Sequence, residues 1–196
     1  KLSPKYQNQE LEDFLPEVEK FALDEFLAAV AKGGSLSIQE KERIANKASE
    51  YTGISAEAYM QHNLNLPTRF YWKELLRDEG FTVGRLDSRY KGIDKMEIGT
   101  SPDFNAELSS WLHSFTPAIN HYLTKNLKFK TDVKYNMFGS VHPWNNDRNN
   151  THEQLRSAMA QNPALHVLVQ SGYYDGATDY FHAKYNLWQI DQAGQM

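Results

Sequence analysis

The chain has 196 residues with a formal net charge of −4, and 40% of its residues are hydrophobic, a composition that excludes an intrinsically disordered protein. Lysines and arginines are spread through every segment, so no basic stripe is present and nucleic acid is excluded as a partner. The absence of cysteine excludes a disulfide scaffold, a thiolate zinc site and a cysteine nucleophile.

The first part of the chain, from about Glu10 to Glu79, has a helical pattern of apolar residues. These residues recur at steps of three and four up to Val30, with Pro16 placed for the first turn. Ser37 forms a capping-box pattern with Glu40, and glycines end each helix. We expect three further helices, over residues 37–53, 55–63 and 67–79.

Glycines and turn formers dominate residues 81–102, which we predict to be an ordered loop with short extended pieces. A helix is expected over residues 104–126, and Pro117 should kink it or break it in two. We therefore expect a helical region over residues 1–126, followed by a region of different character over residues 127–196.

The second region mixes both kinds of pattern. The run from Leu165 to Gln170 is nearly continuously apolar, which is typical of a strand covered on both faces of a parallel sheet. The remaining expected elements are a short strand over residues 131–137 and helices over residues 151–161 and 178–188. The predicted fold is mostly α with a small α/β part.

Asp175 follows the predicted strand by five residues, between Gly172 and Gly176. Catalytic residues of open α/β sheets lie on loops beyond the carboxyl ends of strands. An aspartate there can accept a hydrogen bond from a histidine and hold the tautomer that activates a serine. The alternative is an aspartate that caps the next helix or closes an Asx-turn, which is the commoner use of such a residue.

Two separate segments resemble serine carboxypeptidases of the bacterial type. Residues 171–181, which begin Ser-Gly-Tyr-Tyr-Asp-Gly, resemble the loop that carries the catalytic acid in that family. Residues 65–92, which include Asn-Leu-Pro-Thr-Arg-Phe-Tyr-Trp and Gly-Arg-Leu-Asp-Ser-Arg, are similar to a segment between the family's nucleophile and its acid. Residues 14–59 match the character and order of the family's helical lid. The resemblance covers residues 10–190 and is weakest over residues 125–150.

The resemblance implies an α/β-hydrolase fold, with the helical lid in residues 1–126 and a C-terminal fragment of the hydrolase sheet in residues 127–196. It further implies hydrolysis of C-terminal peptide bonds of a peptide substrate through an acyl-serine, without a cofactor. Asp175 would be the triad acid. Members of that family are typically exported from a bacterial cell, so the resemblance implies a place in the periplasm or the extracellular space.

The chain departs from the family pattern in ways that matter for activity. No Gly-x-Ser-x-Gly sequence occurs, and the family's catalytic histidine in a Gly-His-Met context is missing. His182 follows Asp175 too closely to be its catalytic partner, so we expect it on a helix surface. Gly176 and Asp179 stand where the family has leucine and proline. We therefore expect the chain to be inactive alone.

The chain begins at Lys1 without a methionine, which leads us to expect that the parent protein has an upstream region. A fragment of this kind exposes core surface, so we expect a homo-oligomer or other association that covers it. No run of about 18 apolar residues occurs, and no membrane span is predicted.

A metal-dependent enzyme is the main alternative to a serine peptidase. The seven histidines form neither a His-x-x-x-His pair nor a His-Glu-x-x-His sequence, so no metal site is predicted.

Two sets of residues are weak candidates for substrate binding. Arg85 and Arg89 flank Asp87 with a spacing that could present two guanidinium groups to the terminal carboxylate of a peptide. The favoured alternative is an internal Arg–Asp pair that fixes the loop. Tyr71 and Trp72 could line a side-chain pocket, although core packing is their favoured use.

A hypothesis of another class is a non-catalytic helical module for binding or interaction, with a vestigial acid loop. The sequences that flank this chain in its gene would discriminate between the two hypotheses.

Overall fold

The computed structural model describes residues 1–133, 135, 138–147, 149–191 and 194. It is mostly helical, which confirms the coarse fold class predicted from the sequence. The chain divides into two compact units, Lys1–Glu107 and Leu108–Met196. The helix that we expected to close the first region therefore lies in the second unit.

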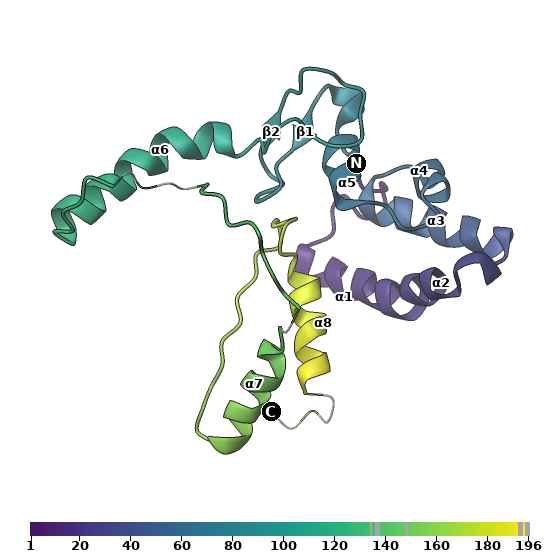
Figure 1. The fold of residues 1–196 in the computed structure, drawn as a ribbon. Helices are drawn as coiled ribbons and strands as arrows, with labels where there is room; N and C mark the ends of the chain where they lie inside the picture. Colours follow the sequence, from purple (N-terminus) through teal and green to yellow (C-terminus); the bar gives the residue numbers. More distant parts are fainter. Residues whose placement is uncertain (134, 136–137, 148, 192–193, 195–196) are drawn as a thin grey trace. The chain divides into compact units, whose positions relative to one another are not determined.

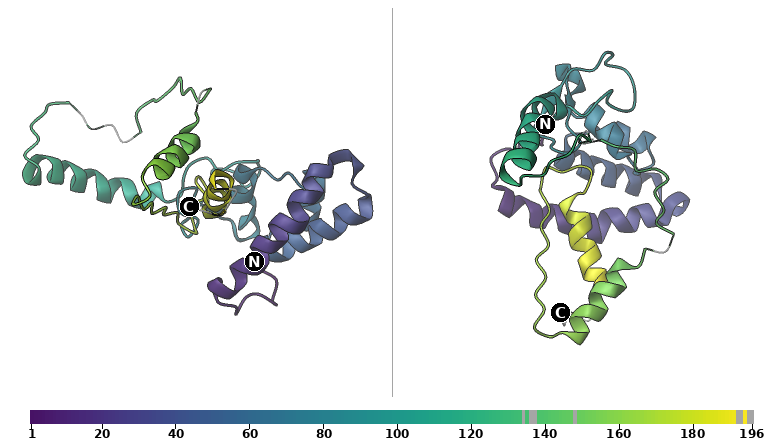
Figure 2. Two further views of the ribbon diagram at one scale, coloured as in Figure 1. Left: turned by 90° about the horizontal axis from the view of Figure 1, so that it is seen from below. Right: turned by 60° about the vertical axis from the view of Figure 1, so that its left-hand side comes forward.

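A hairpin of long helices forms the first part of unit 1. One arm consists of three consecutive helical segments, and α3 runs back along it (Figures 1 and 2). The helix begins five residues before Pro16, so our placement of Pro16 in the first turn was wrong. The arms are α1 (Leu11–Phe21), the π-helical η1 (Ala22–Phe26), α2 (Leu27–Lys32), the short η2 (Gly33–Ser35) and α3 (Ile38–Thr52).

Local capping chemistry sets the limits of α3 and α4, as the sequence predicted. The Ser37 hydroxyl accepts a hydrogen bond from the Glu40 N–H, and Gly53 ends α3 in the left-handed conformation with φ of 77°. Ser55 caps α4 in the same way. The following elements are α4 (Ala56–Gln61), α5 (Thr68–Glu74), the 3₁₀ turn η3 (Arg77–Glu79), β1 (Thr82–Val83) and β2 (Lys91–Gly92).

The core of unit 1 lies between the two arms of the hairpin and α4. Its centre is aromatic, because the rings of Tyr6, Phe14 and Tyr51 lie within 5.9 Å of one another by their centroids. The other buried members are Phe21, Ala29, Ile44, Ala45, Ala48, Ile54, Ala58, Tyr59 and Leu64. Burial of these side chains provides the main driving force for the fold of unit 1.

A carboxylate ties the edge of this core together. Glu17 Oε1 accepts hydrogen bonds from the hydroxyl groups of Tyr51 at 2.7 Å and Tyr6 at 2.9 Å. These two bonds, that of Tyr51 first, hold the pKa of Glu17 below its usual value of 4.5. The Lys47 ammonium lies 4.7 Å from the centre of the Tyr51 ring and donates to the Tyr6 hydroxyl. The cluster joins α1, α3 and the N-terminal segment.

We predict that unit 1 loses stability as the pH falls through the lowered pKa of Glu17. A carboxyl whose pKa is depressed in the folded state stabilises that state above its unfolded pKa, and this contribution disappears on protonation. Between pH 6 and about pH 3 the melting temperature measured by circular dichroism should therefore fall less in Glu17→Gln than in the wild type. Glu12→Gln, on the exposed side of α1, is the control and should follow the wild type. Parallel curves for Glu17→Gln and the wild type would contradict the prediction.

The described part of unit 2 is helical, with three α-helices and the π-helical η4. α6 continues directly into the π-helical η4, and Pro117 lies within α6 without ending it, so no break occurs there (Figure 1). α7 and α8 lie side by side. The bounds are α6 (Leu108–His121), η4 (Tyr122–Asn126), α7 (Thr151–Gln161) and α8 (Tyr180–Ile190).

The described residues of unit 2 form none of the strands predicted there. Residues 165–170 have no strand pairing, because no neighbouring strand lies beside them among the residues that the structure describes. The expected strand over residues 131–137 falls partly outside the described residues, and its described positions carry no strand. The described sheet is instead the antiparallel pair β1–β2, where Thr82 pairs with Gly92. It lies in the segment expected to hold short extended pieces.

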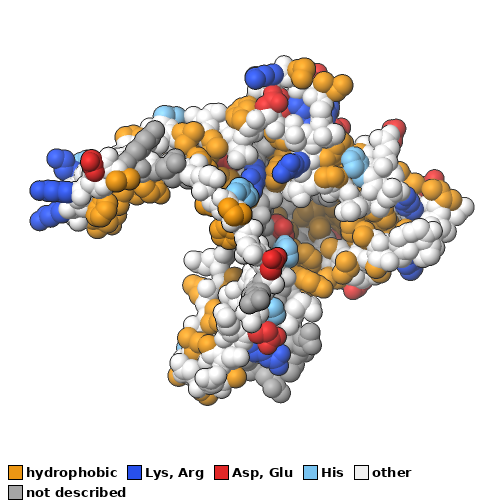
Figure 3. Space-filling model, in the orientation of Figure 1, with side chains coloured by type: hydrophobic (Ala, Val, Ile, Leu, Met, Phe, Trp, Pro, Cys, Tyr) orange, Lys and Arg blue, Asp and Glu red, His pale blue; other side chains and the backbone are white. Residues whose placement is uncertain are grey.

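Unit 2 also differs from unit 1 in its burial. None of the described residues between 108 and 191 is buried, and orange hydrophobic side chains are visible along α6 and around α7 and α8 (Figure 3). The apolar side chains of unit 2 are therefore exposed and available for further contacts.

Among the described residues, no helix has the length and apolarity needed to cross a membrane.

Candidate functional site

The loop that carries Asp175 is organised by its own carboxylate. Asp175 Oδ1 accepts hydrogen bonds from the N–H groups of Ala177 at 2.8 Å and Thr178 at 3.0 Å. The Ser171 hydroxyl donates to the Thr178 carbonyl across the base of the loop at 3.1 Å. Asp175 therefore closes an Asx-turn, the alternative that the residues alone favoured.

The Asx-turn uses only one of the two carboxylate oxygens. Asp175 Oδ2 has no hydrogen-bond donor within the described ranges of the chain, and the side chain is half-buried. An ionised carboxylate can accept from several donors, so Oδ2 retains the capacity to accept a bond from an imidazole N–H. The geometry thus leaves the catalytic interpretation open.

Asp179 and His182 have local roles in the helix that follows. Asp179 Oδ1 accepts a hydrogen bond from the His182 N–H at 2.8 Å and caps α8. The His182 residue is exposed, in agreement with its expected place on a helix surface. The Asp179 side chain therefore fixes the start of α8.

The loop between β1 and β2 holds both arginine candidates, Arg85 and Arg89, and Asp87 binds only the second of them. Arg89 binds Asp87 through both ends of its fork, with Nε to Oδ1 at 2.9 Å and Nη2 to Oδ2 at 2.7 Å. These bonds hold the pKa of the Asp87 carboxyl below its usual range. The internal Arg–Asp pair favoured by the sequence analysis is therefore formed.

Arg85 is placed differently from Arg89. Its guanidinium carbon lies 5.9 Å from the centre of the Trp72 ring, and its side chain has no ion pair or hydrogen bond within the part of the chain that the structure describes. Trp72 itself is 8% exposed. Tyr71 packs against the core of unit 1, and burial raises the pKa of its phenol. Both aromatic candidates therefore serve packing.

Glu107 anchors the loop at its other end. The carboxylate has 0% exposure and accepts from the N–H groups of Leu86 at 2.9 Å and Arg85 at 3.2 Å. A β-carbon at Gly84 would overlap both Glu107 Oε2 and the Asp87 carbonyl oxygen. Only glycine fits at this close approach of loop and carboxylate.

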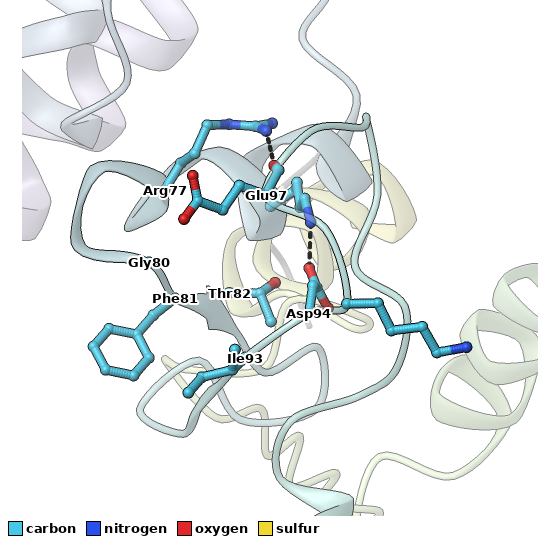
Figure 4. Close-up of a pocket in the computed structure, with 9 residues that line it drawn as sticks. Arg77, Gly80, Phe81, Thr82, Ile93, Asp94 and Glu97 are labelled. Atoms are coloured by element: carbon cyan, nitrogen blue, oxygen red, sulfur yellow. Dashed lines mark hydrogen bonds and ion pairs between the residues drawn. The ribbon is translucent and has the colours of Figure 1, made fainter.

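A small pocket of about 160 Å³ lies between residues 73–82 and residues 93–97 (Figure 4). On one side, the Lys73 ammonium binds Asp94 Oδ2 at 2.6 Å and the Met96 carbonyl oxygen at 2.6 Å. Arg77 binds the carbonyl oxygens of Glu97 and Gly99. Phe81 and Ile93 form the apolar side of the pocket. Lys73 and Arg77 are thus engaged in holding residues 94–99.

Sequence reasoning missed Glu107, Lys73 and Asp94. Lys73 and Asp94 are only 4% and 5% exposed, and burial of such groups requires a charged or hydrogen-bonding partner. The partners lie 21 and 22 residues away in the sequence, so no local pattern identifies them. The one available indication was Gly84, since a glycine just after a strand often marks a close backbone approach.

No family model, curated protein or solved structure matches this chain. Within the described residues, no group of three or more His, Cys, Asp or Glu side chains is placed to hold a metal ion.

We predict that Gly84→Ala destabilises unit 1 by about 1–3 kcal/mol, because the new methyl group cannot avoid the buried carboxylate and a backbone carbonyl. Urea unfolding followed by tryptophan fluorescence measures this change. Gly34→Ala is the matched control, since a β-carbon at Gly34 meets no atom within 4 Å. Equal stability of Gly84→Ala and Gly34→Ala would refute the role of Glu107 in shaping the loop.

Proposed function

We propose that this chain is part of a serine-type carboxypeptidase with an α/β-hydrolase fold, which cleaves C-terminal peptide bonds through an acyl-serine. Asp175 is the acid of the triad, and residues 1–126 contribute a helical lid over the peptide-binding cleft. The serine and the histidine come from other parts of the polypeptide. The chain alone is inactive, needs no cofactor, and belongs to a protein exported from the cell.

The observation that carries this proposal is the state of the Asp175 carboxylate. One oxygen is fixed by the N–H groups of Ala177 and Thr178, and the other has no described donor. A triad acid requires this arrangement, because it must be rigidly oriented and still accept the imidazole N–H. The loop also lies between an extended apolar segment and a helix, as expected for a loop beyond a strand of an α/β sheet.

Residues 165–170 support the proposed sheet. Leu165, Val167 and Val169 line an apolar groove of about 480 Å³ with side chains of α7 and α8, while Leu168 is 82% exposed. The N–H and C=O groups of residues 166–170 have no backbone partners in the described part of the chain. A segment with helices against one face and unpaired backbone edges is suited to pair with other strands.

The exposed apolar residues of α6 favour a second candidate, a non-catalytic helical module for interaction. Leu112 and Phe115 are more than one-third exposed. Both proposals require that the apolar surface of unit 2 be covered, by the rest of the polypeptide or by association such as homo-oligomerisation. They differ in whether Asp175 contributes to chemistry.

We predict that Asp175→Asn in the full-length protein lowers kcat for a peptide substrate on the order of 10⁴-fold, as loss of charge at a triad acid does elsewhere. Asparagine retains the Oδ1 acceptor of the Asx-turn, so the loop keeps its shape. Asp179→Ala is the control. It removes a helix cap worth about 1 kcal/mol of stability and should leave kcat within a few-fold of the wild type.

The rate of labelling by an active-site phosphonate provides a second readout of the same variants. Equal labelling rates for the wild type and Asp175→Asn would exclude Asp175 from the mechanism. Absence of any labelling in the full-length protein would favour the interaction module.

We predict that the amides of residues 166–170 exchange slowly with deuterium in the full-length protein and rapidly in the 196-residue chain. Hydrogen bonds to neighbouring strands protect amides, whereas the unpaired N–H groups described here are open to solvent. Hydrogen exchange followed by mass spectrometry measures both. The amides of α3 serve as the internal control, since they should be protected in both proteins. Rapid exchange of residues 166–170 in the full-length protein would contradict the sheet.

A further inference from the structure

We infer that Arg85 binds a carboxylate group, and that Arg89 does not. The two arginines lie on one loop, and the sequence presents them as equivalent. Their surroundings are not equivalent. Asp87 takes both ends of the Arg89 fork and neutralises its charge, while Arg85 is left with a positive charge that has no anionic partner in the described residues.

Two carboxylates hold the loop that carries Arg85, those of Glu107 and Asp87. Glu107 accepts from the Arg85 and Leu86 N–H groups, and the absence of a side chain at Gly84 lets the carboxylate approach. The Arg89 N–H and fork both bind Asp87, which closes the other half of the loop. A buried carboxylate is costly unless it is satisfied, so this anchor keeps the loop in one conformation.

Trp72 orients the side chain on this fixed backbone. The guanidinium carbon lies 5.9 Å from the centre of the indole ring, at the outer limit of the distance at which cation–π attraction acts. This attraction favours arginine rotamers that face the ring and leaves the edges of the fork available for hydrogen bonds. Less conformational entropy is lost on binding when the side chain is already oriented.

The chemistry of one guanidinium fork selects the ligand. Its two parallel N–H groups match the two oxygens of a carboxylate, which accepts them in a bidentate pair. The same fork can also pair with two oxygens of a phosphate group, so phosphate is the competing anion in the test below. The carboxylate would belong to a peptide, either at its C-terminus or on an acidic side chain. The choice of a peptide rests on the proposed function, whereas the carboxylate chemistry does not.

The test uses the ¹⁵N-labelled 196-residue chain and four small probes. N-acetyl-dialanine carries a terminal carboxylate. The α-amide of N-acetyl-aspartate, whose terminus alone is amidated, carries a side-chain carboxylate. N-acetyl-dialanine amide lacks a carboxylate, and inorganic phosphate is the competing anion. We expect both acids to shift the Arg85 Nε–H and Trp72 Nε1–H signals. The acid that reaches half of its maximal shift at the lower concentration identifies the source of the carboxylate. The Trp72 signal is assigned by its loss in Trp72→Phe.

Matched variants locate the binding group. Arg85→Gln should weaken binding of the acid probes on the order of ten-fold, the effect expected for loss of a charge-assisted hydrogen-bonded pair. Arg69→Gln, which changes another exposed arginine, on α5, should bind as the wild type does. Arg85→Lys keeps the charge without the fork and should bind more weakly than the wild type.

Three results would overturn the inference. These are equal shifts with the acid and its amide, unchanged binding by Arg85→Gln, or a response to phosphate alone. Phosphonate labelling of the full-length protein does not enter this test, so failure of the carboxypeptidase proposal and failure of the Arg85 site can be told apart.

Discussion

The Glu107 carboxylate is the contact on which the β1–β2 loop depends. It is fully buried, and two backbone N–H groups replace the water that it loses. This requirement dictates the nearby sequence, because Gly84 must leave room for the carboxylate and Asp87 must complete the turn through Arg89. The position of Arg85 follows from a residue at the far end of unit 1, 22 residues along the chain.

The two units satisfy their polar groups to different extents. In unit 1, Lys73 and Arg77 bind carboxylate and carbonyl oxygens of residues 94–99, so a loop without regular structure is held firmly. In unit 2, the backbone of residues 166–170 has no described partner, and apolar side chains on both faces reach solvent. Backbone groups and apolar side chains in this state are normally covered in native proteins. The described part of unit 2 therefore leaves both kinds of group exposed.

Local chemistry explains which predictions from the sequence were correct. Ser37 and Gly53 act on their own helix, so the limits of α3 could be predicted from these residues alone. A strand depends on a neighbour, so the apolar run at Leu165 predicted a strand of a parallel sheet for which the described residues contain no pairing partner. The same reason explains why Glu107 and the Lys73–Asp94 pair were missed. Their burial is decided by contacts between distant segments, which no local spacing reveals.

The sequence presents two uses of Asp175 as alternatives, and the Asx-turn seen in the structure does not preclude the proposed catalytic use. A carboxylate has two oxygens, and the Asx-turn occupies Oδ1 alone. Fixing Oδ1 to two backbone N–H groups restricts rotation of the side chain, which in turn fixes the direction of Oδ2. A triad acid benefits from this restriction, because its contribution comes from holding an imidazole in one tautomer and orientation. The turn that makes the residue look structural is therefore also what would prepare it for catalysis.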